Sequence, residues 1–326
     1  MTASAVCGTK SEQDEETENM QIEPTDKVWK NGELIPWKDA TVHVLTHCLH
    51  YGTGVFEGIR CYSTDKGPAV FRLREHMQRL HQSAKAIQLS IPFSTDQLCK
   101  AAKDTVKANK LNSCYIRPIS FFGVQGIGVN PIGYPIETFI VTFAMGAYLG
   151  EEGLRNGIRV HTSSWHRVSN GSVPATAKVC GDYLNSALAV MEAKMNGFEE
   201  TIMLNELHMV AEGSGENIFL VREGRLFTPP LNAGILPGIT RDAVMRIATD
   251  LGYAVTEQNL ARSELFAADE LFFTGTAAEI TPIREVDRRQ VGEGKPGAVT
   301  LSLQKKFQEV VRGKDPKYAS WLDLVK

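Results

Sequence analysis

The sequence predicts an α+β fold in two unequal parts, and three observations support this prediction. Apolar, β-branched runs over 115–122 and 138–143 have the composition of strands. Other segments repeat apolar residues at every third or fourth position, which indicates amphipathic helices. A glycine-rich and charged stretch over 145–156 separates a shorter from a longer part and is the expected interdomain linker. With 326 residues, the chain has the length of about two domains.

The part before the linker begins with a segment that has little to bury. Residues 1–27 are polar and acidic, so we expect a disordered tail there. A short strand begins near Val28, and Asn31-Gly32 is a strong signal for a hairpin turn. A helix with one apolar face follows, and a capping box, Ser94 with Gln97, begins a second helix. The apolar face of the first helix consists of Met77, Leu80, Ala84 and Ile87. The smaller domain is therefore expected over 28–144.

The part after the linker alternates strands with helices and is expected to form the larger domain, 157–326. Strands are predicted over 158–164, 201–205 and 217–222. Further helices are predicted over 240–251 and 299–312, and one begins at Asp182 and ends before Gly197. The apolar face of that helix consists of Leu184, Leu188, Met191 and Met195.

Composition excludes several classes of partner. A net charge of -3 and a pI near 6.3 give no reason to expect nucleic acid or an anionic membrane surface as a partner. No apolar run approaches the roughly 20 residues of a membrane helix, and the first residues do not have the pattern of a signal peptide. The six cysteines contain no CxxC pair, so neither a zinc site nor a disulfide framework is predicted. Reduced thiols and a cytoplasmic location are expected.

Two glycine-containing loops are candidates for binding an anion. In 236–241, Pro237 and Gly238 stand directly before an amphipathic helix, whose free N–H groups and dipole attract negative charge. An ordinary capped helix start has the same composition. The loop 274–279 follows the strand 270–273 and exposes backbone donors in the same way, unless it is only a tight turn. Together the two loops favour a phosphorylated ligand without establishing one.

A third loop, 212–217, offers a carboxylate. Its glycines bend the backbone so that Glu212 could point into a cleft, although a solvated turn has the same composition.

Together with these loops, four motifs resemble the bacterial branched-chain aminotransferases among the fold-type-IV enzymes that use pyridoxal phosphate (PLP). The motifs are LHYGTGVFEGIR (49–60), FRLREHMQRL (71–80), YIRP (115–118) and AKVCGDYLN (177–185). The likeness extends from about Trp29 to the C-terminus, with the motifs in the family's order and spacing. It implies the family's fold, with a smaller N-terminal α/β domain, a short linker and a larger PLP-binding C-terminal domain.

The resemblance also implies how PLP is held. Lys178 would form the aldimine with the cofactor, because a buried lysine amine is a good nucleophile once it has lost its proton. Glu212 would face the pyridine nitrogen, and Tyr183 would donate to the phenolic oxygen. The phosphate would be bound by Arg79 and by the backbone amides of Ile239, Thr240 and Thr276, while Leu236 packs on the ring. No metal is expected.

For the substrate, the resemblance places Thr276, Ala277 and Tyr115 at the α-carboxylate. Phe56 and Tyr148 would line the apolar side-chain pocket, and Arg117 would bind the distal carboxylate of glutamate. Tyr51 and Val129 would come from a neighbouring subunit, so at least a homodimer is expected, and a trimer of dimers is compatible by analogy.

The implied reaction transfers the amino group of L-leucine, L-isoleucine or L-valine to 2-oxoglutarate, giving glutamate and a 2-oxo acid in a reversible ping-pong cycle. Three positions depart from the family pattern. Met145 stands where a tryptophan often shapes the pocket, and Gly54 and Asp182 replace residues that are usually serine and asparagine.

Other functions stay open. A D-amino-acid or amine transaminase or an aminodeoxychorismate lyase would share Lys178 and Glu212 and differ around the substrate. A non-catalytic PLP-binding protein would bind the cofactor without reacting, and a pure scaffold would bind none.

Overall fold

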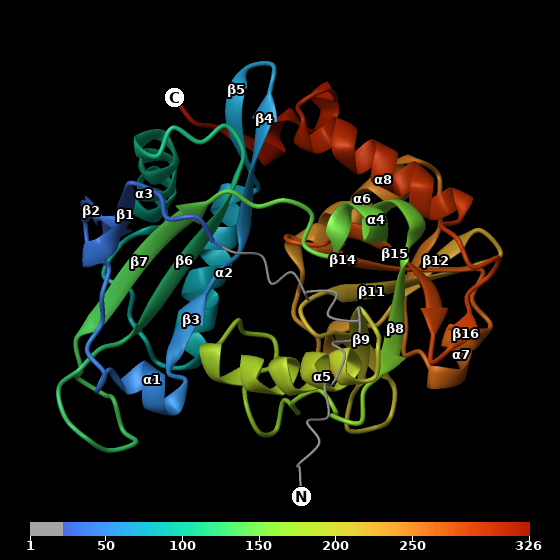
Figure 1. Ribbon diagram of the computed structural model, residues 1–326, viewed down its shortest axis with the longest axis horizontal. Helices are drawn as coiled ribbons and strands as arrows, with labels where there is room; N and C mark the ends of the chain where they lie inside the picture. The colour runs from blue at the N-terminus through green and yellow to red at the C-terminus, as the bar shows by residue number, and fades with distance from the viewer. Residues whose placement is uncertain (1–21) are drawn as a thin grey trace, which may run out of the picture.

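The first sheet of the computed structural model, which describes residues 22–326, is antiparallel throughout (Figure 1). Its strand order is β17-β5-β4-β6-β7-β1-β2, and β3 pairs with β6. The strands are β1 (Lys27–Lys30), β2 (Glu33–Pro36), β3 (Gly54–Phe56), β4 (Ile59–Thr64), β5 (Gly67–Phe71), β6 (Cys114–Phe122), β7 (Ile136–Phe143) and β17 (Leu322–Leu324). With this sheet belong the helices η1 (Trp37–Asp39), α1 (His47–Tyr51), α2 (Leu73–Ala86) and α3 (Thr95–Ala108).

Two local predictions for this part are confirmed. Asn31 and Gly32 both have positive φ, 49° and 109°, and connect a hairpin in which Lys30 pairs with Glu33. Ser94 and Gln97 form the predicted capping box, with bonds of 3.3 Å from the Gln97 N–H and 2.7 Å from the Ser94 N–H. Both features depend on side chains close in sequence, which explains why they were predictable.

The second sheet is mixed and has the order β10-β9-β8-β15-β14-β11-β12-β13, with β16 beside β15. Its parallel pairs are β8 with β9, β8 with β15, and β12 with β13. The strands are β8 (Ile158–Thr162), β9 (Glu200–Leu204), β10 (Val210–Gly213), β11 (Asn217–Arg222), β12 (Arg225–Thr228), β13 (Val255–Glu257), β14 (Glu270–Gly275), β15 (Glu279–Val286) and β16 (Arg289–Gln290). The helices are α4 (Gly150–Asn156), η2 (Cys180–Asp182), α5 (Tyr183–Met195), η3 (Leu231–Ala233), α6 (Ile239–Asp250), α7 (Arg262–Phe266), α8 (Ala298–Val311) and η4 (Pro316–Trp321).

Both faces of the second sheet are buried. Phe219 and Phe272 pack with α6 and α8 in one core cluster, whereas Ile218 and Phe273 belong to the cluster on the opposite face. Successive side chains of a strand point to opposite faces, so apolar residues run without interruption along β11 and β14. In Figure 1, α6 and α8 lie on one side of this sheet and α5 lies on the other.

The expected linker is partly helical. α4 occupies Gly150–Asn156 and packs against β15, so only the first residues of 145–156 are irregular. The chain end also differs from the predicted division, because β17 pairs with β5, with Leu322 opposite Phe71. The first sheet thus includes a strand from beyond the linker. The division into 28–144 and 157–326 stays our proposal, with 322–324 added to the first part.

The predicted tail and the predicted face of α5 differ from the structure in part. Residues 1–21, most of the tail, lie outside the described residues, but Thr25 already donates to the Thr142 carbonyl at 3.0 Å. The predicted apolar face of α5 does not pack on the core: Leu184 is 67% and Met195 86% exposed. The small residues Ser186, Ala189 and Ala193 are buried instead, which brings α5 close to β9.

No helix in the part of the chain that the structure describes has both the length and the hydropathy to span a membrane.

Candidate active site

One cavity between the two sheets gathers most of the predicted site residues. Its lining comes from both parts of the molecule and from the three glycine-containing loops. The predicted residues that line it are Arg79, Tyr115, Lys178, Leu236, Ile239, Thr240, Thr276 and Ala277. Segments that lie far apart in the sequence therefore meet here.

Lys178 lies where the two parts of the molecule touch. Its backbone N–H donates to Ser83 Oγ at 2.9 Å, and its carbonyl accepts from the Phe56 N–H at 3.1 Å. Its Nζ donates to the Tyr183 hydroxyl at 2.5 Å and lies 4.9 Å and 4.8 Å from the ring centroids of Phe56 and Tyr183. Backbone bonds to the first sheet and an aromatic pair thus fix the position of the amine.

Glu212 is buried on β10 and accepts three hydrogen bonds. Arg167 Nε donates to Oε1 at 2.7 Å, and Asn217 Nδ2 and the Leu236 N–H donate to Oε2 at 3.0 and 3.1 Å. Burial raises the pKa of Glu212, and the charge of Arg167 opposes that shift only in part. The carboxyl stands directly behind Asn217 and Leu236, which line the cavity.

Arg79 on α2 supplies a fixed positive charge. Its Nε and Nη2 donate to the two oxygens of Glu57 at 2.7 and 2.9 Å, and its Nη1 donates to the Pro237 carbonyl at 2.8 Å. His76 Nδ1 lies 2.7 Å from Glu57 Oε2. Burial would raise the pKa of Glu57, but the charges of Arg79 and His76 outweigh it and hold this pKa well below its ordinary value. Glu57 is therefore ionised and orients the guanidinium.

The N-terminus of α6 lies beside Arg79 and adds backbone donors. The N–H groups of Ile239 and Thr240 lie in the first helical turn, where intrahelical acceptors are lacking. Gly238 cannot be replaced easily, because a Cβ there would lie 1.9 Å from Asn217 Oδ1. Thr276 and Ala277, in the tight loop between β14 and β15, face the same cavity. This end of the cavity suits a dianion such as a phosphate group.

Phe56, Tyr115 and Arg117 form a cluster next to Lys178. The Arg117 guanidinium lies 5.0 Å from the centre of the Phe56 ring and 5.3 Å from that of Tyr115. Phe56 meets Tyr183 edge to face at 4.7 Å. A Cβ on Gly58 would lie 1.8 Å from the Tyr115 hydroxyl, so this packing requires glycine. An apolar wall and a positive charge are therefore available on the substrate side.

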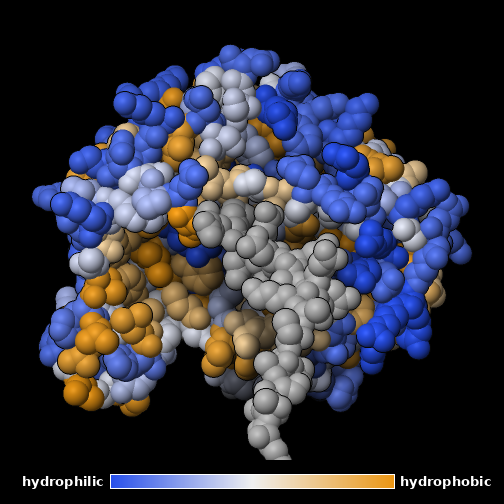
Figure 2. All heavy atoms as spheres, viewed as in Figure 1, coloured by the Kyte–Doolittle hydropathy of each residue, from blue (hydrophilic) through white to orange (hydrophobic). Residues whose placement is uncertain are grey.

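Three predicted residues are not part of this cluster within one chain. Tyr51, Val129 and Tyr148 are 43%, 77% and 44% exposed. Figure 2 shows apolar side chains at the surface over α1 and the loop after β6, where Tyr51 and Val129 belong. The exposed residues of this region include Val44, Leu49, Ile127 and Ile132. Tyr148 lies in the segment between β7 and α4, and the negative charge of Glu216 raises the pKa of Tyr148.

Several residues that hold the site together were not predicted from the sequence. Glu57, His76 and Asn217 lie within the recognised motifs, and their partners could have been inferred from the need to pair buried charges and amides. Arg167 lies outside every motif. It is buried, and only the folded chain shows that it pairs with Glu212.

Comparisons with known proteins agree with this geometry. A family model described as Amino-transferase class IV matches residues 54–286. The chain is 50% identical over 307 residues to the branched-chain-amino-acid aminotransferase of Escherichia coli (strain K12), with 94% of this chain and 99% of that relative covered.

Two solved structures of the T.th. branched-chain amino acid aminotransferase are also similar. The structure with pyridoxamine 5′-phosphate has 48% identity and a TM-score of 0.91, and covers 94% of this chain and 100% of its own. The complex with N-(5′-phosphopyridoxyl)-L-glutamate has 45% identity and a TM-score of 0.89, with the same coverage. The expected family and fold are thus confirmed: this chain is an enzyme that belongs to the class IV amino-transferases and, within them, to the branched-chain-amino-acid aminotransferases.

Proposed function

We propose that this enzyme uses PLP to transfer the amino group of L-leucine, L-isoleucine or L-valine to 2-oxoglutarate. One observation carries the proposal: Lys178, Arg79 and the N-terminus of α6 line one cavity, and the buried Glu212 accepts a hydrogen bond from Leu236 in its lining. The related T.th. enzyme has been solved with pyridoxamine 5′-phosphate and with a phosphopyridoxyl derivative of L-glutamate, which supports this cofactor and a glutamate-forming half-reaction.

The residues of the cavity fit PLP. Arg79 and the N–H groups of Ile239, Thr240 and Thr276 would bind its phosphate, and Leu236 would pack on the ring. Lys178 would join the aldehyde carbon covalently, with Tyr183 donating to the phenolic oxygen. When bound, PLP supplies an electron-accepting ring that stabilises negative charge at the substrate Cα.

Lys178 is the proposed acid–base group. Its Nζ would take up the proton of the substrate Cα and would later give it back, as one positioned base and acid. The Tyr183 hydroxyl and the Phe56 ring restrict where this amine can lie, which would keep such proton transfers short.

Glu212 is the proposed partner of the ring nitrogen. Its raised pKa means that the buried carboxyl holds a proton more readily than a glutamate in water. A proton shared between Glu212 and the ring nitrogen would keep the ring able to accept electrons.

The substrate would be held by both parts of the molecule. Thr276, Ala277 and Tyr115 would bind the α-carboxylate, Phe56 and Tyr148 the apolar side chain, and Arg117 the distal carboxylate of 2-oxoglutarate. Tyr51 and Val129 are surface residues of one chain, so their proposed contribution requires at least a homodimer. Met145, smaller than tryptophan, would leave room in the side-chain pocket.

The test is an absorbance titration of the holoenzyme. Excess L-leucine without an acceptor should convert the visible band of the lysine-bound cofactor to the pyridoxamine form, and 2-oxoglutarate should restore it. Lys178→Ala should lose the visible band, whereas the control Lys194→Ala, an exposed lysine on α5, should behave as wild type. A yellow protein that ignores L-leucine and responds to D-amino acids or amines would overturn the proposed substrate class.

A further inference from the structure

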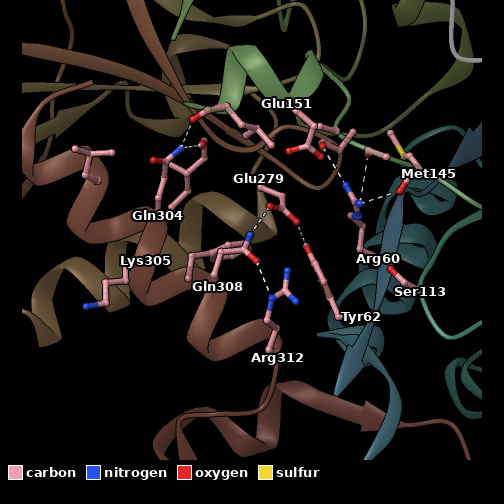
Figure 3. A pocket seen from close by; sticks show the side chains of 17 residues that line it. Arg60, Tyr62, Ser113, Met145, Glu151, Glu279, Gln304, Lys305, Gln308 and Arg312 are labelled. Carbon is pink, nitrogen blue, oxygen red and sulfur yellow. Dashed lines mark hydrogen bonds between the residues drawn. The ribbon is translucent and has the colours of Figure 1, made fainter. Parts of the chain in front are cut away.

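A second cavity, of about 640 Å³, lies behind the loop that contains Thr276 and Ala277. Figure 3 shows its lining, which comes from β4, from α8 and from the segment around Met145. Ala277 lines both cavities, so the far side of the loop faces this second space. The loop is therefore held from the side opposite the cavity of Lys178.

Glu279, at the end of this loop, has an uncommon backbone conformation. Its φ is +52°, in the left-handed region that residues other than glycine rarely adopt, and it is buried. Such a conformation persists where the surroundings enforce it, and it is often found next to functional sites. Here both oxygens of the Glu279 side chain are held by hydrogen bonds.

A directional chain of hydrogen bonds holds the Glu279 carboxylate (Figure 3). Tyr62 on β4 donates to Oε1 at 2.9 Å, and Gln308 on α8 donates from Nε2 to Oε2 at 2.5 Å. Gln308 Oε1 accepts in turn from Arg312 Nε at 3.2 Å. Both partners of the carboxylate are donors, and they come from the two different parts of the molecule.

The backbone carbonyls on both sides of Glu279 also accept hydrogen bonds. Arg60 Nη1 donates to the Ala277 carbonyl at 3.4 Å, Thr281 Oγ1 to Ala278 at 2.7 Å, and Gln304 Nε2 to Ile280 at 2.9 Å. In contrast, the N–H groups of Thr276 and Ala277 donate to no group within residues 22–326. The carbonyls of this loop thus have partners, whereas Thr276 and Ala277, which line the cavity of Lys178, keep N–H groups available for a ligand.

We propose that Glu279 is a positioning residue for the binding of the substrate's α-carboxylate. This inference rests on the proposed function, which assigns the α-carboxylate to Thr276 and Ala277. Glu279 lines the second cavity and not the cavity of Lys178. It fixes the direction of the loop from which the Thr276 hydroxyl and the Ala277 N–H would bind the carboxylate. Tyr62 and Gln308 lie in different parts of the molecule. Binding of the substrate's α-carboxylate therefore depends, through Glu279, on how these two parts pack against each other.

A swap of donor and acceptor tests the proposal. In Glu279→Gln, the new amide can accept from Tyr62, but its NH2 group meets the NH2 group of Gln308. The double variant Glu279→Gln/Gln308→Glu restores every bond, because the carboxylate introduced on α8 would accept both from the new amide and from Arg312. Glu279→Gln should raise KM for L-leucine and for 2-oxoglutarate about tenfold, with kcat changed less than about threefold, and the double variant should return to within about threefold of wild type.

A binding measurement separates this effect from the chemistry. 4-Methylvaleric acid has the carboxylate and side chain of leucine and lacks the amino group, so it reports on binding of these two groups without the reaction. Its Kd for the PLP-bound enzyme should rise about tenfold in Glu279→Gln and about threefold in Tyr62→Phe. The visible spectrum of the lysine-bound cofactor should not change, because Lys178 and Tyr183 lie outside this loop. Lys305→Gln, an exposed position on α8 at the same cavity, is the matched control.

Two results would overturn the inference. Wild-type KM and Kd in Glu279→Gln would show that the loop does not depend on the carboxylate. An equal loss in the single and the double variant would show that the position needs glutamate for another reason. The proposed function has a separate test: if wild type itself did not react with L-leucine, that proposal would fail whatever Glu279 does.

Discussion

Two buried glutamates lie beside the active-site cavity, each paired with a buried arginine, and the two glutamates have opposite properties. Both oxygens of Glu57 accept hydrogen bonds from Arg79, at 2.7 and 2.9 Å, and one of them also contacts His76. Glu212 has a single bond from Arg167, at 2.7 Å, and its other partners are neutral. The pKa of Glu57 is lowered and that of Glu212 is raised.

The difference shows that burial next to an arginine does not determine the charge of a carboxyl. Two charge-assisted bonds and an imidazole outweigh the cost of burying Glu57, so this glutamate keeps a permanent ion pair that orients Arg79. One such bond does not outweigh the cost of burying Glu212, so this glutamate stays able to exchange a proton. The surroundings thus suit Glu57 to hold a charge and Glu212 to transfer a proton.

The largest expected effect is that of Glu57→Gln. The change leaves the Arg79 guanidinium buried without its counter-charge, which costs about 3–5 kcal/mol in the free energy of unfolding. Urea denaturation of the apoprotein measures it, and equilibrium dialysis should show weaker PLP binding. Glu75→Gln, whose carboxylate bonds the neighbouring Arg72 and is partly exposed, is the control and should cost less than about 1 kcal/mol. Equal losses in both variants would contradict the role of Glu57.

Glu212→Gln should affect catalysis instead. An amide cannot share a proton with the ring nitrogen, so kcat should fall about 10²-fold while PLP stays bound. Single-turnover absorbance with L-leucine measures the loss. The expectation is wrong if the variant reacts at the wild-type rate, or if its loss comes entirely from failure to bind PLP.

Arg167→Leu sharpens the comparison, because it removes the charge that opposes the effect of burial on Glu212. The pKa of Glu212 should rise further, and the limb of the pH–rate profile that depends on its ionisation should move to higher pH, with kcat about tenfold lower at neutral pH. Arg222→Leu removes a surface pair with Glu264 and should leave the profile unchanged. An unshifted profile in Arg167→Leu would count against a titrating Glu212.

The smallest expected effect is on stability as a function of pH. Since the fold lowers the pKa of Glu57, its stabilisation is present above the unfolded pKa of about 4.3 and is lost as pH falls through the folded pKa. The fold raises the pKa of Glu212, so its contribution has the opposite sign: stability falls as pH rises above about 4.3, up to the folded pKa. Denaturation of apoproteins from about pH 3 to 8 should show the first slope missing in Glu57→Gln and the second in Glu212→Gln.

Local features of the fold were predictable from the sequence, and long-range partners were not. The strand 217–222 was predicted with the bounds of β11, and the turn at Asn31 and the capping box at Ser94 depend on residues within four positions. The pairing of β17 with β5 joins residues about 250 positions apart, and no local pattern encodes it.

The α5 helix shows a second limit of sequence patterns. Its periodicity identified a true apolar face, but periodicity does not tell which face meets the chain's own sheet, and here the small residues do.

In the active site, too, some residues were predictable from the sequence and their long-range partners were not. Family motifs pointed to Lys178, Arg79 and the glycine loops, and the fold brings these together in one cavity. The residues that tune them were missed because their effect is electrostatic and depends on distance in space. Arg167 is the clearest case: 45 residues separate it from Glu212, and nothing in its neighbouring sequence marks it.

The return of β17 to the first sheet has a consequence for the order of assembly. A chain made from its N-terminus acquires β5 long before the neighbour of β5 at this edge of the sheet, which is synthesised about 250 residues later. Until Leu322–Leu324 arrive, β5 presents unpaired backbone groups to which another strand can bind. Leu322–Leu324 therefore close an aggregation-prone edge, and a nascent chain that stops short of them would leave it open.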